Sequence, residues 1–158
     1  WYSSGDKGVF ENGRLRIQGR LKEIIVTSTG EKVSPADLEL SILADSLFAQ
    51  AWVAGEGRPF IAAFVVLDQQ AWEALARQSG WKVDEGEAAL AQSMVREALL
   101  ARIRAATRDF PHYAQPRAVW ATLTPWTPEN SLLTPTLKLK RNMLAAHFQH
   151  ELEGLYRR

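Results

Sequence analysis

The segment NSLLTPTLKLKRN, residues 130–142, places two lysines shortly after a threonine–proline pair. A lysine side chain ends in a flexible ammonium with three hydrogen-bond donors, which suits a phosphate group. A loop that projects Lys138 or Lys140 from the domain would deliver this charge to a phosphorylated ligand. The alternative is solvated charge at the start of a helix, since most lysines lie on the surface.

Two further segments carry side chains suited to a nucleotide. In WYSSGDKG, residues 1–8, Asp6 offers a carboxylate that can accept hydrogen bonds from both hydroxyls of a ribose. In GRLKEIIVTSTGEKVSPADLE, residues 19–39, Arg20 offers a planar fork of donors, and Gly30 allows a ligand to approach the backbone closely. Taken one at a time, these residues also fit surface charge and ordinary turn positions.

In this order and at these separations, the three segments resemble the C-terminal region of the adenylate-forming superfamily of acyl-CoA synthetases, luciferases and peptide-synthetase adenylation domains. The resemblance covers essentially the whole chain. It implies that Lys138 is the catalytic lysine, which bridges the acyl and phosphate oxygens as a carboxylate reacts with ATP. It also implies that Asp6 holds the ribose and that Arg20 contacts the nucleotide. Gly30 would lie in the loop that lines the tunnel for the pantetheine arm of coenzyme A, and Lys22 would be the hinge.

Three details are most similar to the long-chain fatty-acid–CoA ligases of bacteria and eukaryotes. They are the segment GEGRPFIAAFVVLD, the tail ELEGLY, and Leu137 at a position where many relatives have glycine. The resemblance implies an enzyme that forms a fatty acyl-adenylate from ATP, with Mg2+ bound to the ATP phosphates, and then a thioester with coenzyme A. Ligases that load an acyl carrier protein, and ligases that stop at the adenylate, remain alternatives.

The resemblance also predicts the domain organisation. Residues 1–21 would be the end of a large N-terminal domain with a hairpin that leads to the hinge, and residues 22–158 would be the mobile C-terminal lid. The chain starts at Trp1, inside a motif, so we expect a piece of a longer protein. Its partner would be its own N-terminal domain, which would hold the phosphate-binding loop and the acyl tunnel. The fragment alone would be inactive.

The composition fits one globular domain, which we expect in the cytoplasm. The chain has 158 residues, of which 46% are hydrophobic and 23% charged. It contains no cysteine and no apolar run near the roughly 18 residues that span a bilayer. Peripheral membrane association of the full-length enzyme stays open. We expect no protein metal site, because the three histidines have no cysteine or acid cluster beside them.

A module that binds nucleic acid is the non-enzymatic alternative. The cations that would carry it are Lys138, Lys140, Arg141, Arg157 and Arg158. A net charge of only +1 and the lack of an RNA-binding aromatic motif argue against this function. We therefore expect no nucleic-acid partner.

The hydrophobic patterns predict an α+β fold, with a small mixed β-sheet flanked by helices and preceded by an N-terminal β-hairpin. An Asn-Gly pair at residues 12–13 is the turn signal of that hairpin. Helix starts are indicated by Ser34 with Pro35, by Asp68 and by Asp84. The expected elements after the hairpin are strand 23–27, helix 35–48, strands 51–54 and 60–67, helix 68–80, helix 84–110, strand 118–123, loop 124–136 and helix 142–156.

Overall fold

The computed structural model describes residues 6–11, 14–20, 24–81 and 86–157. Its first element is an antiparallel hairpin of β1 (Asp6–Glu11) and β2 (Arg14–Arg20), in which Glu11 pairs with Arg14. This register leaves two residues for the connection, so the predicted hairpin is confirmed. The Asn-Gly turn itself lies outside the described residues.

A second, shorter hairpin follows, formed by β3 (Ile25–Val26) and β4 (Lys32–Val33). The sequence predicted β3 as part of strand 23–27 but gave no sign of β4. A strand of two residues carries too little alternation to be read from the sequence. The hairpin places residues 27–31 in a turn at its tip.

Helix α1 (Pro35–Ile42) starts where it was predicted, with proline in its first turn. The prediction that it extends to Phe48 is wrong, because the helix ends at Ile42 and Phe48 begins strand β5. The intervening turn is held by Asp45, whose Oδ1 accepts a hydrogen bond from the Leu47 amide at 3.0 Å. Leu47 therefore packs in the core from this turn rather than from a helix.

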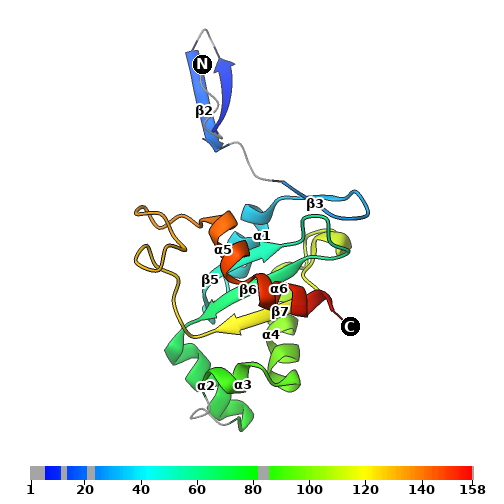
Figure 1. The fold of residues 1–158 in the computed structure, drawn as a ribbon, viewed down its shortest axis with the longest axis vertical. Coiled ribbons are helices and arrows are strands. Elements are labelled where there is room, and N and C mark those ends of the chain that lie inside the picture. Colours follow the sequence, from blue (N-terminus) through cyan, green and yellow to red (C-terminus); the bar gives the residue numbers. More distant parts are fainter. Residues whose placement is uncertain (1–5, 12–13, 21–23, 82–85, 158) are drawn as a thin grey trace.

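The central sheet has three strands in the order β5 (Phe48–Ala54), β6 (Ala62–Leu67) and β7 (Ala118–Thr122). Strands β5 and β6 are antiparallel, whereas β6 and β7 are parallel, so the sheet is mixed as predicted. Every residue of β6 is buried, since both faces of the sheet are covered. Figure 1 shows β6 between its two neighbours, with helices α5 and α6 in front of the sheet.

Alternate residues along the strands enter two different hydrophobic clusters, because successive side chains of a strand point to opposite faces. On β6, Ala63 and Val65 face the cluster that packs against α1, α2 (Gln69–Ser79) and α4 (Ser93–Ala106). Phe64 instead faces a second cluster with Trp52 and with Phe148 from the C-terminal helices. The sheet is therefore sandwiched between two layers, and the 124–140 segment contributes to the second.

Two predicted helices are each divided in the structure. The helix expected over 84–110 appears as α3 (Glu87–Leu90) and α4, and the helix expected over 142–156 appears as α5 (Arg141–His147) and α6 (Gln149–Tyr156). At the first residue of α3, the Oε1 atom of Glu87 accepts hydrogen bonds from the Thr122 hydroxyl at 2.8 Å and the Leu123 amide at 2.7 Å. Contacts with the end of β7 thus hold the start of α3, whereas Asp84, the predicted helix start, lies outside the described residues.

Helix α2 does follow its sequence signals. The Asp68 carboxylate accepts from the Ala71 amide at 3.0 Å, and Gly80 ends the helix in the left-handed conformation. None of the helices in the described ranges is long and apolar enough to cross a membrane.

Candidate functional site

Lys138 lies on a tight turn made by residues 134–138. The backbone amide of Thr134 donates to the carbonyl of Lys138 at 2.8 Å, and the amide of Leu137 donates to the carbonyl of Thr134 at 2.8 Å. The Thr134 hydroxyl accepts from the Lys138 amide at 3.0 Å. These bonds describe a hairpin loop with a β-turn followed by a left-handed residue, and Pro135 occupies the second position that proline favours.

The Lys138 side chain is exposed, and its ammonium has no hydrogen bond or ion pair with any residue in the described ranges. The residue before it, Leu137, has a φ of +66° and is 67% exposed. A left-handed conformation costs an L-residue with a Cβ about 1 kcal/mol or more, which is why glycine usually occupies it. The turn is therefore under local strain one residue before its free cation.

The stem of this turn is fixed to the domain. Leu133 and Leu139 form a β-bridge, and the Lys140 amide donates to the carbonyl of Leu132 at 3.0 Å. Leu132 and Leu133 are both buried in the second hydrophobic cluster. The cation is thus carried on a short projection with a rigid base, rather than on a long free loop.

Arg141 continues this anchoring at the first residue of α5. Its guanidinium forms a two-point ion pair with Glu39 of α1, at 2.7 Å and 2.6 Å. The Glu39 Oε2 atom also accepts the amide of Val53 on β5 at 2.9 Å. The Glu39 carboxylate therefore joins α1, the central sheet and the segment that carries Lys138.

Gly30 lies in the turn of residues 27–31, at the tip of the β3–β4 hairpin. Its φ is +89°, and a Cβ built on it would meet nothing within 4 Å, so the space beside its backbone is open. The carboxylate of Glu31 accepts hydrogen bonds from the hydroxyls of Thr29 and Thr27 in the same turn. These two hydroxyls, first Thr29 and then Thr27, hold the pKa of Glu31 below its ordinary value, so the carboxylate is charged at neutral pH.

The base of this second turn is attached to the connection between β5 and β6. The amide of Gly57 donates to the carbonyl of Val26, and the amide of Ser28 donates to the carbonyl of Arg58, each at 2.9 Å. The Glu56 carboxylate accepts the amide of Val26, also at 2.9 Å. The turn that contains Gly30 is consequently as well supported as the turn that contains Lys138.

The predicted site residues do not converge on one point of this chain. Figure 1 shows the 27–31 turn, in light blue beyond β3, and the 134–138 turn, in orange, at opposite sides of the domain. Asp6 and Arg20 are Cα partners across the β1–β2 hairpin, so their positions lie opposite each other on adjacent strands. Lys22, the predicted hinge, lies outside the described residues.

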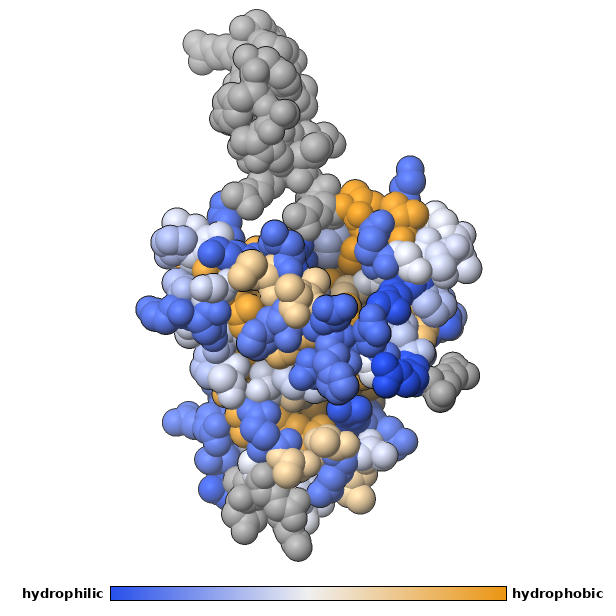
Figure 2. Space-filling view, viewed as in Figure 1, coloured by the Kyte–Doolittle hydropathy of each residue, from blue (hydrophilic) through white to orange (hydrophobic). Residues whose placement is uncertain are grey.

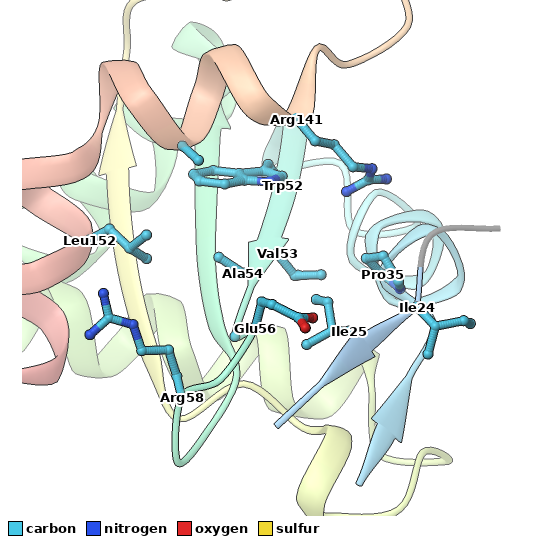
Figure 3. Close-up of a pocket in the computed structure, with 12 residues that line it drawn as sticks. Ile24, Ile25, Pro35, Trp52, Val53, Ala54, Glu56, Arg58, Arg141 and Leu152 are labelled. Atoms are coloured by element: carbon cyan, nitrogen blue, oxygen red, sulfur yellow. The ribbon is translucent and has the colours of Figure 1, made fainter. Parts of the chain in front are cut away.

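A pocket of about 340 Å³ lies between the start of β3, strand β5 and helices α5 and α6 (Figure 3). Trp52, Val53 and Ala54 of β5 line its floor, and Arg141 and Arg58 enter from different sides. Next to it, Figure 2 shows an apolar patch over the β3 region, where Ile24 and Val26 are 45% and 37% exposed. In the described residues no group of three histidine, cysteine or acidic side chains is placed to hold a metal ion.

Sequence reasoning missed two features of this site. The Glu39–Arg141 ion pair links residues 102 positions apart, and no local pattern indicates such a contact. The role of Glu31 had a signal that was not used: the pentapeptides TSTGE and TPTLK share threonines at the first and third positions. Repeated threonines beside a left-handed position indicate side-chain hydrogen bonds within a turn.

Comparison with known proteins supports the resemblance to adenylate-forming enzymes over the whole chain. The chain is 36% identical over 165 residues to the long-chain-fatty-acid–CoA ligase FadD15 of Mycobacterium tuberculosis, which covers 99% of this chain and 26% of that protein. It is 33% identical over 160 residues to the long-chain-fatty-acid–CoA ligase 5 of Mus musculus, covering 99% of this chain and 23% of that protein. The chain thus spans about a quarter of the length of these relatives.

Solved structures and family models agree. The adenylation domain of a carboxylate reductase from Mycobacterium chelonae has the same fold, with a TM-score of 0.75 and 24% identity, and the match covers 97% of this chain and 22% of that one. Residues 22–158 match the model of the AMP-binding enzyme C-terminal domain. This chain therefore belongs to the family of AMP-binding enzyme C-terminal domains.

Proposed function

We propose that this chain is the mobile C-terminal lid of an ATP-dependent long-chain fatty-acid–CoA ligase. In the first half-reaction a fatty acid carboxylate attacks the α-phosphorus of MgATP and pyrophosphate leaves. In the second, the thiol of coenzyme A attacks the acyl carbon and AMP leaves. The observation that carries the proposal is the free ammonium of Lys138 on an anchored turn, in a chain that matches such ligases over 99% of its length.

The role of Lys138 follows from the charges of the first half-reaction. A carboxylate and a triphosphate repel each other, and negative charge concentrates around the α-phosphorus in the transition state. An ammonium that reaches both sets of oxygens stabilises that charge as it develops. Lys138 has no competing partner among the described residues, so no ion pair has to break before it acts.

The positions of the two turns support an alternation between half-reactions. They project from opposite sides of the domain in Figure 1, so one cleft could receive only one of them at a time. We propose that the lid first presents the 134–138 turn to the nucleotide. It then rotates and presents the 27–31 turn, where the open side of Gly30 faces the pantetheine arm.

We propose Lys22 as the hinge, with residues 1–21 belonging to the large domain and 22–158 to the lid. The family match, which begins at residue 22, supports this boundary. Asp6 and Arg20 would then bind the ribose and the nucleotide from the large-domain side, and their opposed positions across the hairpin suit a shared ligand. The enzyme would work in the cytoplasm, where ATP and coenzyme A are available.

The experiment that tests the proposal uses the full-length enzyme with Lys138→Ala. Removing a donor aimed at transition-state charge costs about two to three orders of magnitude in rate. We expect that loss in pyrophosphate release from MgATP and palmitate. Thioester formation from supplied palmitoyl-adenylate and coenzyme A should stay near the wild-type rate. Lys140→Ala is the matched control and should lower neither rate by more than a few fold.

If Lys138→Ala forms the adenylate at the wild-type rate, the assignment of Lys138 is wrong. The acceptor is tested separately, by offering coenzyme A and acyl carrier protein to the wild-type enzyme. If the acyl group is transferred only to the carrier protein, the enzyme is an acyl carrier protein ligase and not a CoA ligase. Lys22→Pro should preserve adenylate formation but block the second half-reaction. Unchanged overall turnover would show that Lys22 is not the hinge.

A further inference from the structure

The two turns of the candidate site have the same pattern of hydrogen bonds. In the 27–31 turn, the amide of Thr27 donates to the carbonyl of Glu31 at 2.9 Å, and the amide of Gly30 donates to the carbonyl of Thr27 at 3.0 Å. The Thr27 hydroxyl accepts from the Glu31 amide at 3.2 Å. The 134–138 turn makes the same three bonds between corresponding residues, at 2.8, 2.8 and 3.0 Å.

The correspondence extends to the side chains and to the position with a positive φ. The hydroxyl oxygens of the first and third residues, both threonines, lie 3.1 Å apart in each turn. The fourth residue has a positive φ in each, +89° at Gly30 and +66° at Leu137. By this alignment Glu31 occupies the place of Lys138, with the opposite charge.

The two fifth residues are used differently. The Lys138 side chain has no partner in the described part of the chain, whereas the Glu31 carboxylate folds back and accepts the hydroxyls of Thr27 and Thr29. Glu31 therefore fastens the turn that carries it instead of reaching outward.

The sequences explain why the 27–31 turn, and not the 134–138 turn, needs a carboxylate to stabilise it. Pro135 fixes the second position of the 134–138 turn, because its ring sets φ near the value that a β-turn requires. The 27–31 turn has Ser28 at that position and Gly30 at the fourth, where glycine adds conformational freedom. A carboxylate that binds two hydroxyls compensates for the missing proline.

We propose that Glu31 is a positioning residue for the thioester half-reaction: by binding Thr27 and Thr29 it holds Gly30 in the conformation that receives the thiol-bearing arm of coenzyme A. The inference rests on the proposed function, since it assigns the 27–31 turn to the second half-reaction. Glu31 takes no proton and forms no bond to the substrate. Its removal lets the turn sample other conformations, so fewer enzyme molecules align the thiol with the acyl carbon.

The test measures the half-reactions of the full-length enzyme with Glu31→Ala. Misplacement of a reacting group by about 1 Å costs on the order of a hundredfold, so we expect thioester formation from palmitoyl-adenylate to fall about tenfold to a hundredfold. The loss should appear in kcat, with the KM for coenzyme A nearly unchanged. Pyrophosphate release should stay within about twofold of wild type, and Glu31→Gln should recover part of the rate, because its amide oxygen still accepts a threonine hydroxyl.

The matched control is Thr136→Ala, which removes the threonine at the third position of the other turn. It should slow pyrophosphate release and spare thioester formation, the reverse of Thr29→Ala. Equal losses in both half-reactions with Glu31→Ala, or no loss in either, would overturn the role of Glu31. If Glu31→Ala fails to fold, Thr29→Ala replaces it, and the same pattern of rates decides. A failed proposed function is recognised separately, because Lys138→Ala would then leave adenylate formation intact.

Discussion

Glu39 and Arg141 form a two-point ion pair although they lie 102 positions apart in the chain. The side chain of Glu39 is only 7% exposed and that of Arg141 22%, so water contributes little to their solvation. The pair holds the first turn of α5 against α1, three residues beyond Lys138. The position of the turn that carries Lys138 therefore depends on a contact made elsewhere in the domain.

Replacing Arg141 by methionine should destabilise the chain by about 3 kcal/mol, because a buried carboxylate loses its cation. Urea unfolding of the domain measures this change. The Glu39→Gln/Arg141→Met double variant should lose less than the sum of the two single variants, since each single change already removes the pair. Strictly additive losses would show that the pair is not coupled.

Glycine should relieve the backbone strain at Leu137, the residue before Lys138. Leu137→Gly should leave the melting temperature unchanged or raise it, because glycine tolerates a φ of +66° while adding freedom to the unfolded chain. Leu137→Val should lower stability by about 1 kcal/mol, since a β-branched residue fits this conformation worse. Thermal unfolding of the three proteins in parallel checks the order, and a valine variant more stable than the glycine variant contradicts it.

Asp45 should make the stability of the domain sensitive to acid. Burial alone would raise its pKa, but hydrogen bonds from Arg102 at 2.8 and 2.7 Å and from the Leu47 amide lower the pKa below its ordinary value. A lowered folded-state pKa gives stability that is complete above the unfolded pKa and is lost as the pH falls through the folded pKa.

Asp45→Asn should accordingly cost about 1 kcal/mol at neutral pH, a value kept small because Arg102 is partly exposed. The difference from wild type should shrink as the pH is lowered below about 4. Denaturant unfolding across this pH range is the measurement, and Asp109→Asn, at an exposed aspartate, is the control. If the stability difference between wild type and Asp45→Asn grows as the pH is lowered, the pKa of Asp45 is not lowered by folding.

The phenol of Tyr156 should lose its proton at a higher pH than an exposed tyrosine does. Burial raises the pKa of its phenol to about 12, with nearby Arg58 opposing the shift. The hydroxyl donates to the carbonyl of Phe60 at 2.7 Å, and the two rings pack at 4.6 Å. A raised folded-state pKa gives stability that is present below the unfolded value of about 10 and is lost as the pH rises toward 12.

Tyr156→Phe should remove this alkaline loss of stability and cost about 1 kcal/mol at neutral pH, because the carbonyl of Phe60 loses a donor. Ultraviolet titration of tyrosinate, comparing wild type with the variant, isolates the late phase. If the phase that the variant loses is instead the one at about pH 10, the phenol of Tyr156 is exposed to solvent.

The sequence predicted the sheet better than the helix lengths. Strands 51–54 and 60–67 were predicted as a hairpin around a glycine-rich link, and the structure pairs β5 and β6 antiparallel, with every residue of β6 buried. Lys138 was singled out by a motif whose residues are neighbours in the chain, and the structure leaves its ammonium free among the described residues.

Contacts between distant segments account for what was missed. Phe148 interrupts the last helix to fill the second cluster beside Phe64, at 5.5 Å between ring centroids. Glu87 is drawn to the end of β7 rather than to a longer helix. In both cases the local pattern favours continuous helix, and packing that only the folded chain provides overrides it.

The order of strands in the central sheet has a consequence for synthesis of the protein. Strand β6 lies at the middle of the sheet, but its parallel neighbour β7 follows some 50 residues later in the chain, beyond α2, α3 and α4. A growing polypeptide on the ribosome would therefore show an unpaired, wholly apolar edge until β7 emerges, and such edges recruit other strands. Products truncated before residue 118 should aggregate, and this stretch of translation is where we would look for chaperone engagement.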